Sequence, residues 1–305
     1  MKPIRPMNLA PQLLSRLLLL LACAIPITIM ADELKVAVAQ PLVTPGDIQG
    51  NITRMEPMLA EAVKHGSDLV VFSECGITGY DYQGVSARSA IPQNDPALDK
   101  VSDLAKKYQI AVIAGFHEKD GNNLRNSAMV FYPDGKRTLQ RKHRIQDPEM
   151  GIAPVTPGPR ERVLFNLKGF TCAVLICSDD GIDGIYEELA RKNCDMVILI
   201  TAGAGHESFG FHKADLSDPE KLKKFAQTTA KECLTEDFVA RSFKLQMALV
   251  ACNQMGWQTD IGYFHPGGSC IIDHTGDVSA LIPMHLIFES LRPQFATGIV
   301  TRKIK

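Results

Sequence analysis

Three features that the 305-residue sequence lacks narrow what the protein does. Its 33 basic and 34 acidic residues nearly cancel, to a formal net charge of -1, so no excess of positive charge favours a nucleic acid as partner. It has no internal repeat and no low-complexity tract, which excludes solenoids and propellers. Its cysteines form no C-x-x-C pair and no Cys/His cluster with zinc-site spacing, so no zinc site is predicted.

Long hydrophobic runs are also absent. The apolar stretch Leu17–Ala31 has 15 residues and is interrupted by Pro26, whereas a membrane-spanning helix needs about 20 residues. Basic residues precede the stretch and the polar "DELK" follows it, which predicts a secretory signal at 1–31 and an exported, periplasmic or secreted domain at 32–305. A loose match to a lipoprotein box would instead lipidate Cys23, and we expect the membrane as a partner only through the signal or this lipid. An uncleaved anchor and a mis-assigned start codon are the alternatives.

The remainder of the chain has the composition of an ordinary globular domain. Hydrophobic residues make up 45% and charged residues 22%, which is ample apolar material for a large core. Seven cysteines lie after the signal, and an odd number in an oxidising compartment leaves at least one thiol. Cys172, Cys252 and Cys270 lie in apolar runs, so we interpret them as core residues.

Hydrophobic periodicity predicts alternating strands and helices, followed by hairpins. The first part alternates strand and helix, with strands at 34–40, 68–74 and 110–116 and helices within 45–66 and at 97–109. Hairpin turns are predicted at 134–135, 168–169 and 274–277, further strands at 195–201 and 247–253, and helices at 185–193 and 218–246. This mixture of parallel and antiparallel strands indicates an α/β fold, and helices covering one face of each of two mixed β-sheets would give a four-layer α-β-β-α sandwich.

Three predicted strands end in a reactive polar group. Glu74 ends "VVFSE", Lys142 follows "TLQR" and Cys177 ends "CAVLIC". Acids and bases at strand ends of α/β proteins tend to face a common crevice. Taken singly, Glu74 is also explained as a cap of the next turn, Lys142 as one of several solvated basic residues and Cys177 as a core thiol.

Together the three groups make a workable catalytic set. A thiolate is a strong nucleophile, and a neighbouring lysine lowers the thiol pKa and donates to a developing oxyanion. A carboxylate takes the thiol proton and later deprotonates water. That chemistry suits addition to a carbonyl or nitrile carbon followed by hydrolysis of the adduct, and it requires no metal and no cofactor.

The motifs around these residues resemble the carbon–nitrogen hydrolase (nitrilase-like) superfamily over nearly the whole mature length. The matching stretches are "VAVAQ", "VVFSECGITGY", "AGFHEKDGNNLRNSAMVFYPDGK", "LQRKHRI", "VTPG", "VLICSDD", "ACNQMG" and "GGSCIIDHTGDV". The resemblance implies Glu74 as general base, Lys142 as oxyanion stabiliser and proton donor, and Cys177 as nucleophile. It also implies the α-β-β-α sandwich, a homodimer and a small-molecule substrate.

Several residues depart from the family pattern. Ser178 stands where an aromatic residue usually follows the cysteine, and Gly181 where an Arg or Trp near the substrate is common. Glu149 is the acid nearest to the place of a second family glutamate that buttresses the lysine. Arg144 occupies a position where His or Lys is common. Trp257, the only tryptophan, lies near the expected pocket loops, so Ser178, Glu149 and Trp257 are candidate oxyanion or substrate contacts.

The resemblance leaves several functions open. The "CSDD" stretch favours an amide-type substrate over a nitrile, because true nitrilases typically follow the cysteine with Trp-Glu. Nitrile hydrolysis and acyl transfer use the same three residues. A catalytically inactive ligand-binding member of the fold is a third alternative. A structural protein with Cys177 in a disulfide is the least favoured, because Cys172 and Cys177 face opposite sides of one strand.

Overall fold

The computed structural model describes residues 33–80, 88–146, 154–203, 220, 236–258, 263–284 and 292–303. All of them belong to one compact unit, Asp32–Lys305. The proposed signal at 1–31 lies outside the described residues. No helix within the described ranges is long and apolar enough to cross a membrane.

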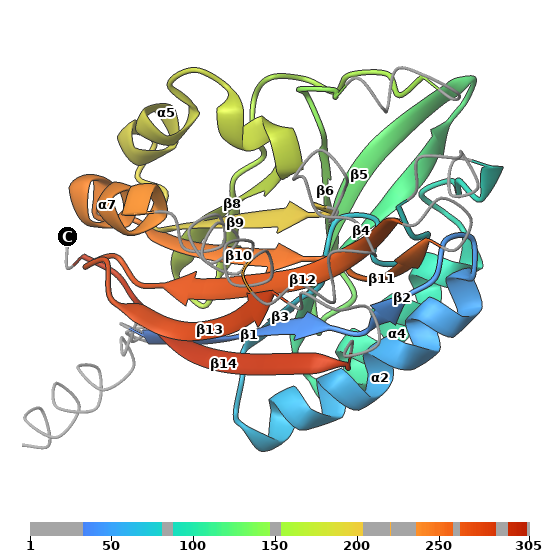
Figure 1. The fold of residues 1–305 in the computed structure, drawn as a ribbon, viewed down its shortest axis with the longest axis horizontal. Helices are drawn as coiled ribbons and strands as arrows, with labels where there is room; N and C mark the ends of the chain where they lie inside the picture. The colour runs from blue at the N-terminus through green and yellow to red at the C-terminus, as the bar shows by residue number, and fades with distance from the viewer. Residues whose placement is uncertain are drawn as a thin grey trace, which may run out of the picture. The chain divides into compact units, whose positions relative to one another are not determined.

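The first sheet has six strands and mixes parallel with antiparallel pairing (Figure 1). In spatial order they are β14 (Gln294–Thr301), β1 (Glu33–Gln40), β3 (Leu69–Val71), β4 (Ala111–Asp120), β5 (Asn123–Phe131) and β6 (Arg137–Arg141). The central strands β1, β3 and β4 run parallel, and the remaining pairs are antiparallel. β5 and β6 are the hairpin predicted at Asp134–Gly135.

The second sheet is built in the same mixed way. In spatial order its strands are β2 (Leu42–Val43), β11 (Met255–Gln258), β12 (Tyr263–Ile272), β10 (Ala248–Asn253), β9 (Met196–Thr201), β8 (Phe170–Ile176) and β7 (Phe165–Leu167), while β13 (Val278–Met284) also pairs with β12. β8, β9 and β10 run parallel. The hairpins predicted at 168–169 and 274–277 are present as β7–β8 and β12–β13.

The alternation of side chains along β1 explains the layers. Val36 and Val38 point into the core cluster between the two sheets, where they lie with residues of β8, β9 and β10. Ala37 and Ala39 belong to the cluster on the other face, against α2 (Ile48–Lys64) and α4 (Pro96–Tyr108). Successive side chains of a strand point to opposite faces, so one strand lines two layers.

The second sheet is covered in the same manner. Its outer side chains pack with α5 (Ile185–Arg191) and α7 (Glu236–Leu245). The order helix, sheet, sheet, helix confirms the predicted four-layer sandwich. The buried stripe of α2 ends at Ala62, and Val63 is 43% exposed because it lies past the edge of the apolar face.

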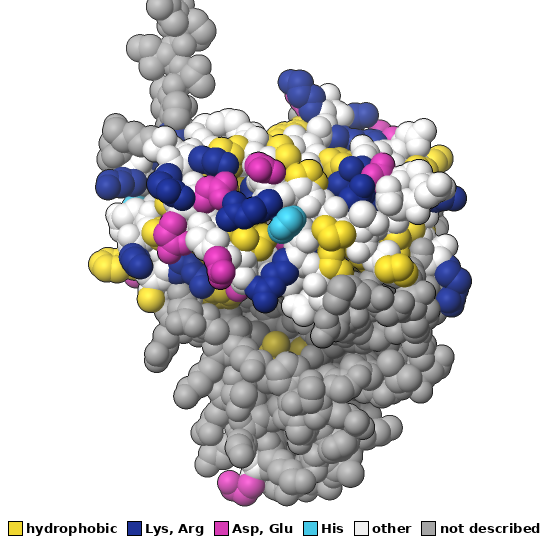
Figure 2. Space-filling model, turned by 90° about the horizontal axis from the view of Figure 1, so that it is seen from above, with side chains coloured by type: hydrophobic (Ala, Val, Ile, Leu, Met, Phe, Trp, Pro, Cys, Tyr) yellow, Lys and Arg dark blue, Asp and Glu magenta, His cyan; other side chains and the backbone are white. Residues whose placement is uncertain are grey.

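The charged side chains on the described face in Figure 2 form no patch of a single sign. Lys and Arg side chains alternate with Asp and Glu side chains across it. This mixture agrees with the net charge of -1.

Candidate active site

Glu74 begins the turn that follows β3, and its side chain is buried. The strand ladder extends past β3, since Gly115 of β4 donates its backbone N–H to Ser73 O at 3.1 Å. A Cβ added at Gly115 would lie 2.4 Å from Cys75 N and 2.8 Å from Glu74 Cα. Only glycine therefore allows β4 to pass this close behind the turn that carries the carboxylate.

Lys142 directly follows β6 and meets Glu74 inside the protein. Its Nζ lies 2.8 Å from Glu74 Oε1, and both side chains are 1% exposed. Asn126 Nδ2 on β5 donates to the same oxygen at 2.7 Å. The lysine backbone is also fixed, since its N–H donates to Asn126 O at 2.8 Å and its carbonyl accepts from Gly158 N at 2.7 Å. Two of the three predicted reactive residues are thus in direct contact.

Cys177 is the first residue after β8 and opens a 3₁₀ turn, Cys177–Gly181. It is partly exposed and lines a cavity of about 410 Å³. Its φ of 48° is in the left-handed region, which costs a non-glycine residue about 1–3 kcal/mol, and strained residues of this kind cluster at functional sites. Cys75, next to Glu74, has the same φ but is fully buried.

The other thiols are in a different environment. None of the six cysteines in the described part of the chain forms a disulfide with another. Cys172, Cys252 and Cys270 are buried, as predicted. Burial raises the pKa of the Cys172 thiol well above its usual value and raises the pKa of Cys252 and of Cys270 to about 12. These three thiols therefore stay protonated and unreactive at neutral pH.

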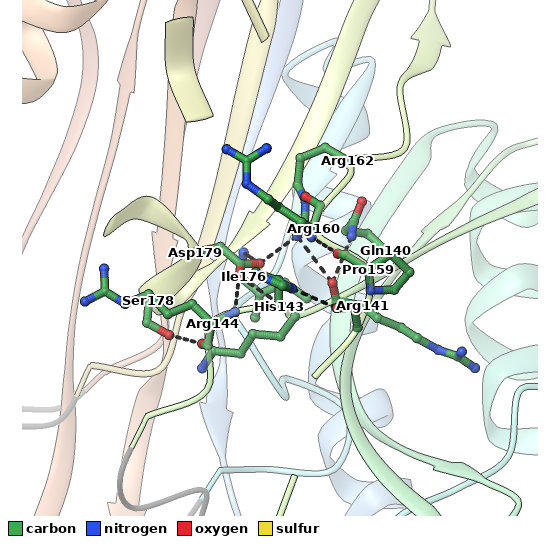
Figure 3. A network of polar contacts seen from close by, with 12 residues as sticks. Gln140, Arg141, His143, Arg144, Pro159, Arg160, Arg162, Ile176, Ser178 and Asp179 are labelled. Carbon is green, nitrogen blue, oxygen red and sulfur yellow. Dashed lines mark hydrogen bonds and ion pairs between the residues drawn. The ribbon is translucent and has the colours of Figure 1, made fainter. Parts of the chain in front are cut away.

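The turn that begins at Cys177 is tied to the segment after Lys142 by Asp179 (Figure 3). Asp179 Oδ1 accepts from the backbone N–H groups of His143 and Arg144, each at 2.9 Å. Ser178 Oγ donates to the carbonyl of Arg144. Because His143 is the residue after Lys142, these bonds hold the cysteine turn beside the lysine segment.

Arg162 completes this network through its ion pair with Asp179. Its NH1 lies 2.8 Å from Asp179 Oδ2, and both side chains are almost wholly buried. The guanidinium also donates to three backbone carbonyls, those of Arg141, Pro159 and Arg160. Desolvation lowers the pKa of Arg162, although Asp179 opposes the shift. The pair holds three chain segments together.

Arg141 makes a separate ion pair, with the buried Glu118, on the opposite side of β6. Its Nε and NH2 donate to Glu118 Oε2 and Oε1 at 2.9 and 2.6 Å. Ser127 Oγ and Gln93 Nε2 also donate to the Glu118 carboxylate, both at 2.6 Å. Neighbouring residues of one strand face opposite sides, so Arg141 and Lys142 serve different carboxylates.

The remaining candidate contacts fall in different places. Ser178 lines the cavity. Trp257 lies in β11, but its side chain lies outside the described residues. Glu149 lies in the range 147–153, which the structure does not describe. Among the described residues, no group of three His, Cys, Asp or Glu side chains is placed so that it could hold a metal ion.

Asn253, in the motif "ACNQMG", fixes one wall of the cavity. Its Oδ1 accepts from Thr201 Oγ1 and Gly203 N, each at 2.8 Å, and its Nδ2 donates to Gly267 O at 2.6 Å. The side chain therefore joins the ends of β9 and β10 to the middle of β12. Asn253 therefore has a structural role, because its side-chain amide already makes these hydrogen bonds within the protein.

Residues 35–284 match the family model described as carbon–nitrogen hydrolase. The chain belongs to the carbon–nitrogen hydrolase family. Among solved structures, a double mutant of the amidase from Nesterenkonia sp. AN1, in complex with acrylamide, has a TM-score of 0.71 at 18% identity, covering 88% of this chain and 91% of that one. The predicted superfamily and fold are thereby confirmed, and the chain is a carbon–nitrogen hydrolase enzyme.

Curated relatives of this hydrolase carry several activities. A glutamine-dependent NAD(+) synthetase of Acinetobacter baylyi is 26% identical over 82% of this chain and 42% of its own length. A nitrilase of Pyrococcus abyssi is 31% identical over 48% of this chain and 56% of its own length. The hydrolase thus spans only about half, or less, of these relatives.

Sequence reasoning missed Asp179 and Arg162, although both lie close to the predicted residues. Asp179 was part of the quoted motif "CSDD", so its position two residues after the cysteine was the available signal. Arg162 had none, because "GPRERV" has the composition of a solvated loop.

Proposed function

We propose that this enzyme hydrolyses an amide-type carbon–nitrogen bond through a thioester on Cys177. Glu74 serves as general base and Lys142 as oxyanion stabiliser and proton donor. The observation that carries the proposal is the buried 2.8 Å contact between Glu74 and Lys142. A carboxylate and an ammonium that are buried and in contact are preorganised for proton transfer and for stabilising charge that develops beside them.

Acylation starts with the transfer of the Cys177 thiol proton to Glu74. The sulfur adds to the amide carbon, and Lys142 donates to the oxyanion that forms on the former carbonyl oxygen. The carbon–nitrogen bond then breaks. The leaving nitrogen takes a proton from Lys142, which regains one from the protonated Glu74 across their contact.

Deacylation uses the same groups in a second round. Glu74 takes a proton from water, whose oxygen adds to the thioester carbon. The carbon–sulfur bond breaks, the carboxylic acid leaves, and the thiolate regains its proton from Glu74. The same set would release the acyl group to an amine if an amine entered in place of water.

The relatives give this reading chemical support. One structure of the Nesterenkonia amidase has the acetamide moiety of fluoroacetamide added covalently at its active-site cysteine. Another relative is named as a glutamine-dependent enzyme, and glutamine carries a side-chain amide. In this chain, the partly exposed Cys177 on the cavity is the thiol available for such an adduct.

The test is ammonia release from a panel of aliphatic amides, combined with intact-mass detection of an acyl adduct. Cys177→Ala should abolish both signals while the circular dichroism spectrum and Tm stay close to wild type, because the thiol is removed from a cavity wall rather than from the core. Retention of most of the activity in this variant would remove Cys177 from the mechanism.

A matched control comes from β8, the strand that directly precedes Cys177. Cys172→Ala removes a buried thiol and should lower stability but keep the acyl adduct. Limited iodoacetamide should label Cys177 before Cys172, Cys252 and Cys270, since burial raises the pKa of those three thiols.

Nitrile hydrolysis is the second candidate function. The observation in its favour is the identity with the nitrilase of Pyrococcus abyssi. Addition of Cys177 to a nitrile carbon would give a thioimidate, and two waters would then release ammonia and an acid. Including nitriles in the panel separates the two functions by the ratio of their kcat/KM values.

We also propose that the enzyme is exported and that the exported form begins near Asp32, on the pattern of basic, apolar and polar residues at the N-terminus. N-terminal sequencing of protein from cell fractions tests this cleavage. A cytoplasmic product that starts at Met1 would exclude export, and a fatty-acylated Cys23 would support lipidation instead.

A homodimer is proposed on the family resemblance. Light scattering at several protein concentrations measures the mass in solution. A monomer at all concentrations would contradict it.

A further inference from the structure

The cavity beside Cys177 has two charged groups among its described lining residues, Arg144 and Asp180. Asp180 is compensated, since its Oδ1 accepts from Arg241 NH1 at 3.1 Å and from the Tyr186 hydroxyl. Arg241 is itself held in place, with its guanidinium 4.1 Å from the centre of the Tyr186 ring. The negative charge on this wall is therefore neutralised by a fixed arginine.

Arg144 is held firmly by its backbone while its side chain stays exposed. Its N–H donates to Asp179 Oδ1 at 2.9 Å, and its carbonyl accepts from Ser178 Oγ. The guanidinium NH1 donates to the carbonyl of Gly181. Across the described ranges of the chain, no carboxylate forms an ion pair with Arg144. A positively charged group with spare donors thus faces the cavity.

The glycine at position 181 makes room for this arginine. A Cβ added there would lie 2.1 Å from Arg144 NH1 and 3.2 Å from its Cζ. The guanidinium therefore occupies the volume where any side chain at 181 would begin. Position 181 lies on the cysteine turn, whereas Arg144 comes from the segment that follows Lys142, on the other side of the Asp179 link.

We propose that Arg144 binds a carboxylate of the substrate, so that the enzyme acts on amides that also carry an anionic group. A planar guanidinium binds a carboxylate through two parallel hydrogen bonds, and Asp180 does not oppose an anion while Arg241 neutralises it. The proposal rests on the proposed function, because it assumes that the amide is cleaved at Cys177.

Two amides of the same shape test this recognition. Succinamate carries a carboxylate where 4-methylpentanamide carries an isopropyl group, and both present the same primary amide. Charge-assisted hydrogen bonds to the guanidinium should raise kcat/KM for succinamate about 10- to 100-fold above that for its neutral analogue. Equal values, or a preference for the neutral amide, would overturn the proposal.

Variants then locate the recognition at Arg144. Arg144→Gln should lower the ratio of the two kcat/KM values by about 10- to 100-fold, mainly through a higher KM for succinamate. Arg144→Lys keeps the charge but not the fork and should give an intermediate ratio. Gly181→Ala keeps all charges but displaces the guanidinium, and should also lower the ratio.

Lys136→Gln is the matched control for charge. It removes one positive charge from an exposed hairpin turn, where Lys136 pairs with Asp134 at 2.9 Å, and should leave the ratio unchanged. An equal fall in the ratio for Lys136→Gln and Arg144→Gln would show a general effect of net charge and would contradict a site at Arg144.

Binding to an inactive chain separates this inference from the proposed function. Calorimetry with Cys177→Ala measures the affinity for succinamate and for 4-methylpentanamide without catalysis. If neither amide is hydrolysed but succinamate binds through Arg144, the anion site stands and the hydrolytic proposal fails. If both amides are hydrolysed equally and succinamate has no binding advantage, the hydrolytic proposal stands and the anion site fails.

Discussion

The protein has two buried ion pairs, Glu74–Lys142 and Asp179–Arg162, and the two pairs differ in the groups that surround them. Glu74 and Lys142 are 2.8 Å apart, and Asp179 and Arg162 are also 2.8 Å apart, all four side chains being almost fully buried. Distance and burial therefore do not separate them. Glu74 shares its oxygen with another side chain, Asn126, whereas the second pair bonds otherwise to backbone.

The second pair is a structural clamp. Its further contacts are backbone N–H groups for the carboxylate and backbone carbonyls for the guanidinium, contributed by residues 143, 144 and 176 and by residues 141, 159 and 160. Such a pair fixes the path of the chain. The proposed function, by contrast, requires the Glu74–Lys142 pair to move protons, and the following variants test this difference.

Removing the cation of the clamp should give the largest effect, and on stability. Arg162→Met leaves the Asp179 charge buried without its partner, which should lower the free energy of unfolding by about 3–5 kcal/mol. Urea unfolding followed by circular dichroism measures it. The folded fraction, titrated by the acyl adduct on Cys177, should keep a rate within about tenfold of wild type, because the clamp touches no reacting atom.

A double variant sharpens this point. Replacing Arg162 by Met and Asp179 by Leu removes both charges, which often restores stability where an ion pair has only itself to satisfy. Here we expect no restoration, because the backbone N–H groups bound by Asp179 lose their acceptor. Recovery of wild-type stability would show that the backbone bonds are unimportant.

Removing the cation of the proposed reactive pair should act on the rate. Lys142→Ala should lower kcat by about 10²–10³ or more, equivalent to about 2.7–4 kcal/mol, as for a donor in an oxyanion site. Lys142→Arg should fail to rescue, since a planar guanidinium does not reproduce the compact ammonium. Wild-type activity in Lys142→Ala would leave the pair as a second structural clamp.

Substitution of Arg141, the residue before Lys142, should have a milder effect. The ammonium introduced by Arg141→Lys does not reproduce the two parallel bonds that the guanidinium makes to the buried Glu118 carboxylate. We expect a loss of about 1 kcal/mol in stability and little change in kcat. A larger effect on kcat than on unfolding would place Arg141 in the reaction.

The smallest effect is the acid sensitivity of Glu118. Burial alone would raise its pKa, but hydrogen bonds from Arg141, Ser127 and Gln93 outweigh it, and the pKa lies below the usual 4.5. A carboxylate whose folded pKa is depressed stabilises the fold above its unfolded pKa, and this contribution is lost as the pH falls through the folded pKa. Unfolding free energies measured from pH 7 to pH 3 should show the gap between wild type and Glu118→Gln shrinking below about pH 4.5.

Much of the fold followed from local patterns. The alternating strands and helices before Phe116 and the three hairpin turns have strong periodicity or turn residues. β14 was not predicted, although it pairs with β1 along its whole length. Its sequence "QFATGIVT" is half-exposed at a sheet edge and has no continuous apolar run. Its partner β1 lies at the opposite end of the sequence.

In the candidate site, too, some features could be predicted from local sequence patterns and others could not. Glu74, Lys142 and Cys177 were predicted because each ends or directly follows a predicted strand, a pattern visible along the chain. The contact between Glu74 and Lys142 and the position of Arg144 over Gly181 depend on how segments distant in sequence meet. Single-sequence patterns carry no information on such contacts, so they could be identified only from the structure.

Gly115 has a consequence for mutational scanning and for enzyme engineering. It bears no side chain, lines no part of the described cavity and takes no part in the proposed chemistry, yet any larger residue would push against the backbone of residues 74 and 75. A library covering every position should therefore find position 115 as intolerant as the three positions proposed to be catalytic. Engineers who wish to change the substrate range should keep Gly115 and vary the residues that line the cavity.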